Sequence, residues 1–180
     1  MARIPVHTVD SAPEPSRDAL KGLEAKFGKV LNIHGEMAHS PVVLNAYAAI
    51  QQVIAEQGTF DAATQQAIAL VVATVDRCEY CQAAHTGGAK RAGLTEEQTV
   101  AIRRGEVEFD PKLAALMTLV RVSVSDVGYV PDEVWQAALD AGWSDVELTE
   151  VSVHIALNLF TNHFNHLVDT DLDLPAAPAL

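Results

Sequence analysis

Two cysteines and a histidine lie close together in residues 78–85, and they are the residues with the clearest chemical potential. On a helix, Cys78, Cys81 and His85 are spaced by three and four residues, so all three project from one face. Helix N-termini, a neighbouring protonated histidine and C-x-x-C geometry each lower a thiol pKa from its usual value of about 8.5. The pattern predicts a redox-active cysteine pair, with His85 as a base or proton carrier.

Two other interpretations of the pair remain open. Free cysteines are often simply small buried apolar residues. The more specific alternative is a zinc site formed by Cys78, Cys81, His163 and His166. It is disfavoured because the H-x-x-H spacing is shorter than usual and the chain has no second C-x-x-C. No metal site is therefore predicted.

The elements that must hold these residues all have helical signatures. Cap residues such as Ser16 and Ser40, glycine stops and apolar spacing of three and four indicate successive helices. A valine-rich apolar run at 67–73 is also compatible with a buried strand, but helix-compatible sequence on both sides favours a helix. The expected helices are 16–27, 41–57, one from Asp61 through that run, 77–92, one after Thr95, one from Asp110, 131–141, and 144–168.

No alternating strand pattern, repeat or linker interrupts these segments. The sequence therefore predicts an all-α, single-domain helical bundle over residues 16–168. Residues 1–15 and 169–180 are expected to be loosely held ends.

The composition narrows the classes of partner. Twelve Lys and Arg against 24 Asp and Glu give a formal net charge of −12. Such a surface repels phosphate backbones and anionic membranes, so no nucleic-acid or membrane partner is expected. The chain shows no signal-peptide pattern and no apolar window of spanning length, which predicts a cytoplasmic location. There a C-x-x-C is catalytic or metal-binding more often than a structural disulfide.

The motif C-x-x-C-x-x-x-H, preceded by an apolar helix and followed by Ala-Gly-Leu at 92–94, resembles the alkyl hydroperoxidase D group of the carboxymuconolactone decarboxylase-like superfamily. The resemblance is strongest over 62–93 and weaker from Ser40 to Val168, and the C-terminal half resembles the peroxidase-related members. It implies an all-helical homo-oligomer that reduces peroxides through thiols, an antioxidant activity without a cofactor. It also implies that Cys81 attacks the peroxide, that Cys78 resolves the product as a disulfide, and that His85 belongs to a proton relay.

This chain departs from the family pattern at two positions. Gln66 stands where the family commonly has a glutamate, twelve residues before the first cysteine. Glutamine can hold a hydrogen bond but cannot take up a proton at neutral pH. Tyr80 stands between the cysteines, where the hydroperoxidase itself has a histidine.

Polar residues recur every four positions on the last helix, beginning with His154 and Asn158 and continuing through Asn162 and His166. They are interpreted either as buried or interfacial hydrogen-bonding groups or as one wall of the active-site pocket. In the second interpretation His154 replaces the missing acid.

The leading functional hypothesis is a thiol peroxidase or dithiol–disulfide oxidoreductase that cycles through a Cys78–Cys81 disulfide. It would need an external dithiol donor, either a thioredoxin-like or a lipoyl-bearing protein. A lyase acting on a lactone carboxylate is one alternative, although that chemistry does not need a cysteine pair. A non-catalytic redox sensor or assembly subunit is the other, and Gln66 supports it.

Overall fold

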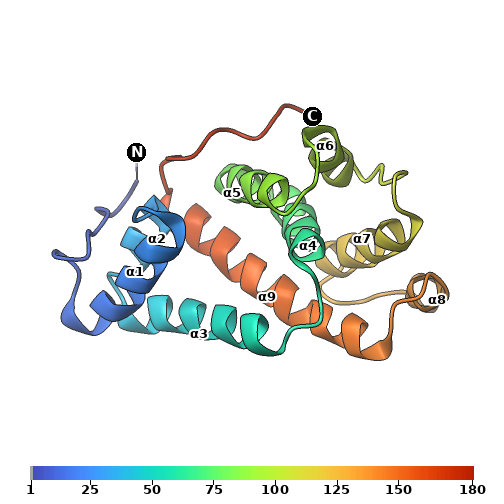
Figure 1. The fold of residues 1–180 in the computed structure, drawn as a ribbon, viewed down its shortest axis with the longest axis horizontal. Helices are drawn as coiled ribbons and strands as arrows, with labels where there is room; N and C mark the ends of the chain where they lie inside the picture. Colours follow the sequence, from blue (N-terminus) through green and yellow to red (C-terminus); the bar gives the residue numbers. More distant parts are fainter. Residues whose placement is uncertain (1) are drawn as a thin grey trace. The chain divides into compact units, whose positions relative to one another are not determined.

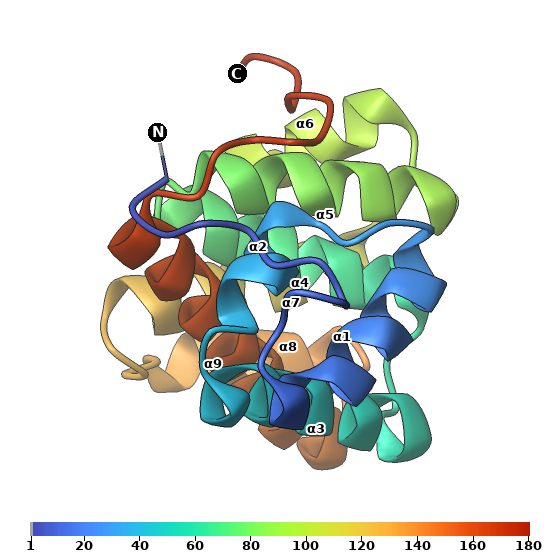
Figure 2. The same ribbon diagram turned by 90° about the vertical axis from the view of Figure 1, so that its left-hand side faces the viewer.

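The computed structural model describes residues 2–180, and every regular element in that range is an α-helix (Figures 1 and 2). This confirms the predicted all-α class. The helices are α1 (Glu14–Phe27), α2 (Asn32–Met37), α3 (Pro41–Gln57), α4 (Ala62–Val75), α5 (Glu79–Arg91), α6 (Glu96–Arg104), α7 (Pro111–Ser125), α8 (Asp132–Asp140) and α9 (Asp145–Val168). None of the helices formed by residues 2–180 combines the length and apolarity needed to cross a membrane.

Local capping chemistry sets four of the predicted helix starts. At Asp61, Thr95, Asp110 and Ser144, a side-chain oxygen accepts a hydrogen bond from the backbone N–H three residues later. Each bond satisfies one of the N–H groups that a helix leaves unpaired at its beginning. These four starts are confirmed.

Three local expectations need correction. Helix α1 begins at Glu14 after Pro13 rather than at Ser16, which is buried inside the helix. Ser40 precedes α3, but its side chain makes no capping hydrogen bond. Helix α2 was not anticipated, because it has only six residues and the residue before it, Leu31, offers no capping side chain.

The chain divides into two compact units. The first unit comprises residues 2–58 and 163–173, and in it α1 and α2 pack against α3. The second unit comprises residues 59–162 and 174–180 and contains α4 to α8 with most of α9. The cysteine pair and His85 belong to the second unit.

Helix α4 is the central helix of the second unit. Its apolar run at 67–73 is at most 2% exposed at every position, as expected for a helix surrounded by other elements. It packs against α5, α6 and α7, and α5 lies alongside it in both views (Figures 1 and 2). The helical interpretation of this valine-rich run is confirmed, and burial on all sides explains why the run has no polar face.

The segments outside residues 16–168 make hydrogen bonds to other parts of their own units. The Arg3 N–H donates to the Val168 carbonyl at 2.7 Å, and Lys29 forms an ion pair with Asp173 at 2.9 Å. In the second unit, the Arg103 guanidinium donates to the Pro178 carbonyl.

Candidate active site: the Cys78–Cys81 pair and His85

A tight corner between α4 and α5 positions the first cysteine. The Cys78 N–H donates to the Ala73 carbonyl at 2.9 Å, and the Arg77 N–H donates to the Thr74 carbonyl at 3.1 Å. This pair of bonds is the Schellman pattern that ends many helices, usually with glycine in the left-handed position. Here Arg77 occupies that position with φ +57°. The corner places Cys78 directly at the start of α5.

Cys78 is the N-cap residue of α5 rather than part of its helical face. Its Sγ accepts the Cys81 N–H at 3.4 Å, so one thiol is hydrogen-bonded to the backbone of the other cysteine. Both residues are thiols, and they are only 1% and 2% exposed. A helix N-terminus favours negative charge at this position, whereas burial of the thiols opposes it.

His85 is held by neutral amide side chains from two other helices. Its Nδ1 lies 3.0 Å from Oε1 of Gln66 on α4, and Asn158 on α9 supplies a further side-chain hydrogen bond. Because an amide oxygen only accepts, the contact with Gln66 assigns the proton to Nδ1. In the neutral ring, Nε2 is then the nitrogen that can take up a proton.

The environment keeps His85 neutral at physiological pH. Burial lowers the pKa of His85 to about 4, and the hydrogen bond with Asn158 opposes this shift only in part. The expectation that a protonated histidine helps to lower the thiol pKa is therefore wrong for this chain. A neutral His85 can instead accept a proton.

Gly88 creates the space for the Gln66 side chain. A Cβ atom at this position would lie 2.2 Å from Oε1 and 2.7 Å from Cδ of Gln66. At the adjacent Gly87, the nearest atom would be Nη1 of Arg91 at 3.5 Å, an ordinary contact. Close packing of a neighbouring helix therefore explains Gly88 but not Gly87.

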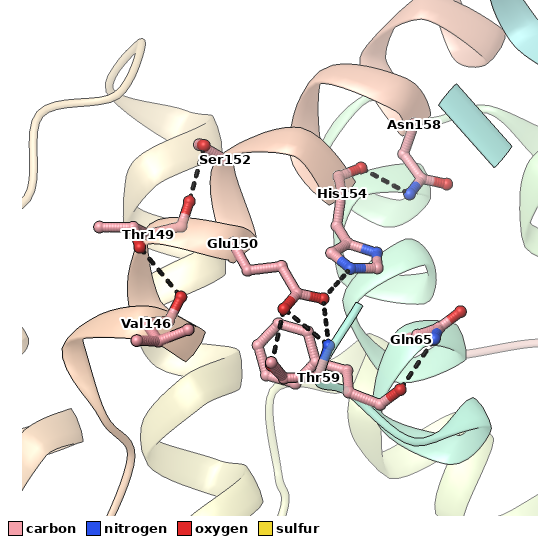
Figure 3. Close-up of polar contacts among 9 residues, drawn as sticks. Thr59, Gln65, Val146, Thr149, Glu150, Ser152, His154 and Asn158 are labelled. Atoms are coloured by element: carbon pink, nitrogen blue, oxygen red, sulfur yellow. Dashed lines mark hydrogen bonds and ion pairs between the residues drawn. The ribbon is translucent and has the colours of Figure 1, made fainter. Parts of the chain in front are cut away.

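His154 belongs to a separate cluster, drawn in Figure 3. Its Nε2 lies 3.1 Å from a carboxylate oxygen of Glu150, and Glu150 also accepts hydrogen bonds from the backbone and hydroxyl of Thr59. Burial alone would raise the pKa of Glu150, but the hydrogen bonds from Thr59 and His154 outweigh it and lower the pKa. The Glu150 carboxylate therefore stays ionised, and it is the hydrogen-bond partner of His154 Nε2.

The side chain of Asn158 hydrogen-bonds to the main chain of His154 and not to its ring. Its Nδ2 donates to the His154 carbonyl at 2.8 Å (Figure 3). Gln66 and Asn158 thus meet at His85, whereas the His154 ring does not join them. Further along the stripe, Asn162 donates to the carboxylate of Asp76 at the α4–α5 corner, at 2.8 Å.

Two contributors to this region had no signal in the sequence. Glu150 and Arg103 look like ordinary charged residues of amphipathic helices, yet Arg103 is 3% exposed and donates to Oε1 of Gln82 at 3.1 Å. His163 and His166, the remaining ligands of the zinc alternative, are exposed. Across residues 2–180, no group of three or more His, Cys, Asp or Glu side chains is arranged to hold a metal ion.

Comparison with known proteins places the cysteine pair within a family segment. Residues 41–109 match the model of the carboxymuconolactone decarboxylase family. A stretch of 54 residues is 41% identical to "uncharacterized protein 4 in cox locus" of Paracoccus denitrificans. That stretch covers 30% of this chain and 49% of the relative, so the match spans about half of the relative's length.

Solved structures share the whole fold at low sequence identity. An alkylhydroperoxidase AhpD core protein of Ralstonia eutropha JMP134, described as peroxidase-related, has a TM-score of 0.85 at 17% identity, over 96% of this chain and 92% of that one. A peroxidase-related protein of Silicibacter sp. TM1040 gives 0.77 at 15%, over 94% and 91%. The debrominase Bmp8, as a cysteine-to-alanine variant in complex with 2,3,4-tribromopyrrole, gives 0.79 at 17%, over 96% and 92%. The match of residues 41–109 to the family model and the shared fold bear out the resemblance noted in the sequence: this segment is similar to the carboxymuconolactone decarboxylase family, and the chain has the fold of the peroxidase-related structures.

Proposed function

We propose that this protein is a thiol-dependent peroxidase or dithiol–disulfide oxidoreductase that uses Cys81, Cys78 and His85. The observation that carries the proposal is the hydrogen bond from the Cys81 N–H to Cys78 Sγ at the start of α5, with a neutral histidine one turn beyond Cys81. Two thiols at a helix start can exchange between dithiol and disulfide. The family match and the peroxidase-related fold neighbours support the same class of chemistry.

The reaction divides into two balanced steps. In the first, the Cys81 thiol gives its proton to Nε2 of His85, and the thiolate attacks the hydroperoxide. The O–O bond breaks, sulfur becomes a sulfenic acid, and the alcohol leaves with a proton from the imidazolium. In the second step, the Cys78 thiol attacks the sulfenic sulfur, which forms the disulfide and releases water.

Return to the dithiol state needs an external dithiol, for which a thioredoxin-like or lipoyl-bearing protein is suitable. The hydrogen bond to Cys78 Sγ stabilises a leaving thiolate at that position. A lower leaving-group pKa speeds thiol–disulfide exchange, so the reductant is expected to attack Cys81 and release Cys78.

The test is a thiol count with two matched serine variants. After one equivalent of cumene hydroperoxide, the parent protein should lose both thiols and yield one equivalent of alcohol. Cys81→Ser should not react. Cys78→Ser should consume one equivalent and leave a sulfenic acid at Cys81, trapped with dimedone and located by mass spectrometry.

Other results would change the assignment. A sulfenic acid trapped at Cys78 in the Cys81→Ser protein would reverse the roles of the two thiols. No reaction in any of the three proteins would exclude the peroxidase. A disulfide that forms once but is not turned over by any dithiol would favour the redox sensor.

The debrominase neighbour supports a second candidate, reductive dehalogenation by the same dithiol. One carbon–bromine bond would be replaced by carbon–hydrogen while the two thiols become a disulfide, with bromide and a proton released. Bromide release from 2,3,4-tribromopyrrole, matched by loss of two thiols, would establish this activity. If no bromide is released while the hydroperoxide is turned over, the dehalogenase activity is excluded.

A further inference from the structure

Arg103 is a buried cation without a carboxylate partner. It lies near the end of α6 and is 3% exposed, and its Nε has no hydrogen-bond partner. Its Nη atoms donate only to neutral acceptors, Oε1 of Gln82 and the Pro178 carbonyl. Among residues 2–180, no Asp or Glu lies within ion-pair distance of this guanidinium, although the chain contains 24 acidic residues. A buried charge without a counter-ion is strongly unfavourable, so this site is suited to an anion.

The segment that accepts a hydrogen bond from Arg103 consists of Leu, Pro and Ala residues. Leu174–Leu180 has the sequence Leu-Pro-Ala-Ala-Pro-Ala-Leu, without a polar side chain. It groups with the second unit and runs along α5 towards α6 in both views (Figures 1 and 2). The hydrogen bond of Arg103 to this segment is accepted by a peptide carbonyl. A carboxylate accepts from a guanidinium more strongly, and through two oxygens.

The site is connected to the cysteine helix. Gln82, which accepts the second hydrogen bond of Arg103, directly follows Cys81 in α5. A ligand that pairs with Arg103 would therefore be held beside the helix that carries both thiols.

We propose that Arg103 recognises the carboxylate of a small ligand with an apolar body, and that Leu174–Leu180 occupies this ligand's site in the structure described. The inference rests on the proposed function in one respect, namely that the ligand is the reacting substrate. The segment offers only apolar side chains, and its Pro178 carbonyl takes the place of the carboxylate. Binding of the ligand displaces the segment.

Binding is tested with an unreactive pair of compounds, 4-isopropylbenzoate and its neutral analogue 4-isopropylbenzamide. By calorimetry, the amide should bind at least about tenfold more weakly than the acid, the effect of one charge-assisted hydrogen bond. Arg103→Gln should abolish the preference. Arg104→Gln removes an exposed charge from the adjacent position and should leave the preference intact.

Displacement of the segment is measured in the full-length parent protein, so it does not depend on the folding of a variant. The methyl resonances of Leu174 and Ala177, which are partly buried, should move towards random-coil positions on addition of the acid but not of the amide. Equal binding of the two compounds, a preference that survives Arg103→Gln, or unchanged methyl resonances at saturation would each overturn the proposal.

A kinetic comparison separates this inference from the proposed activity. Cumene hydroperoxide and its para-carboxylate differ only in the charged group, and the carboxylate should have the lower KM in the parent but not in Arg103→Gln. Selective binding of 4-isopropylbenzoate without turnover of either hydroperoxide would refute the peroxidase and leave the anion site standing. Turnover of both with equal KM would refute the anion site and leave the peroxidase standing.

Discussion

At the scale of single residues, the contact between Gln66 and His85 joins two side chains 19 positions apart in the sequence. A glutamate at position 66 would place a negative charge beside the ring and favour its protonated form. Glutamine supplies the same hydrogen bond without the charge, and burial then dominates and lowers the pKa of His85 to about 4. The substitution therefore sets the protonation state of His85 as well as removing an acid.

Gln66→Glu should raise the rate of reaction with peroxide and shift its pH dependence. A positioned acid–base group contributes on the order of 10²-fold or more, so the gain should be readily measurable. In the parent, the inflection due to His85 is expected near pH 4, because the neutral base is lost only as the pH falls through its pKa. The introduced carboxylate should move that inflection upward. The measurement is kcat/KM for cumene hydroperoxide between pH 4 and 8.

Gln57→Glu is the matched control, because it adds the same charge at an exposed position at the end of α3. It should leave both rate and inflection unchanged. If Gln66→Glu folds normally but reacts no faster, His85 needs no acidic partner, and the absent relay acid is not what limits the reaction.

The sequence identified the cysteines and His85 because their spacing within one helix is a local property. Gln66 was identified as a candidate site residue by comparison with the family pattern. Asn158, which also contacts His85, was identified by its position in a polar stripe. Arg103 was not found, because its burial depends on contact with Pro178, 75 residues away. Residue spacing also does not show that Glu150 is the hydrogen-bond partner of the His154 ring, because the position of Glu150 depends on its contacts with the distant Thr59.

At the scale of elements, the position of the Gln66 side chain between α4 and α5 depends on Gly88. A methyl group at position 88 would overlap Oε1 and Cδ of Gln66, and these atoms belong to a flexible side chain that can move away. Displacing them would remove the hydrogen bond that orients His85 while both helices stay in place.

Gly88→Ala should therefore lower the rate of reaction with peroxide while leaving thermal stability close to that of the parent. Alanine favours a helix by about 1 kcal/mol over glycine, which offsets the cost of moving Gln66. Stopped-flow kinetics and thermal unfolding followed by circular dichroism measure the two effects separately.

Gly87→Ala provides the comparison on the same helix. Its added methyl meets only Arg91 at an ordinary distance, so it should raise the Tm and leave the rate unchanged. Equal rates in the two alanine variants would show that the Gln66 contact has no influence on the chemistry.

Helix starts were predictable where the capping signal is local, as at Asp61 and Thr95. They were not predictable where tertiary contacts replace a cap. The six-residue α2 has no side-chain cap, yet all its residues except Asn32 are buried. Packing rather than propensity stabilises so short a helix.

At the scale of the whole molecule, the division into two compact units could not be read from the sequence. No proline-rich or glycine-rich linker separates them, and α9 contributes residues to both. Periodicity reports which face of a helix is buried, but not which other helices cover it.

Helix α3 carries an exposed apolar stripe. Val42, Ala46, Ala49 and Val53 are spaced by four, three and four residues and are all exposed, with Val42 at 79% and Val53 at 51%. This is the spacing of a helix–helix seam, and the two central alanines permit close approach of a second helix.

We expect this stripe to pair with a second copy of the chain, so that the protein is a homo-oligomer. Light scattering at micromolar concentration should give a mass of at least twice 19.3 kDa. Val53→Glu would bury a carboxylate in the seam and should shift the protein towards the monomer. Ala55→Glu introduces the same charge at an exposed position on the other side of α3 and should leave the mass unchanged. A parent protein that scatters as a 19.3 kDa monomer would refute the homo-oligomer. If the parent is an oligomer and the Val53→Glu variant keeps the same mass, the interface lies on a surface other than this stripe.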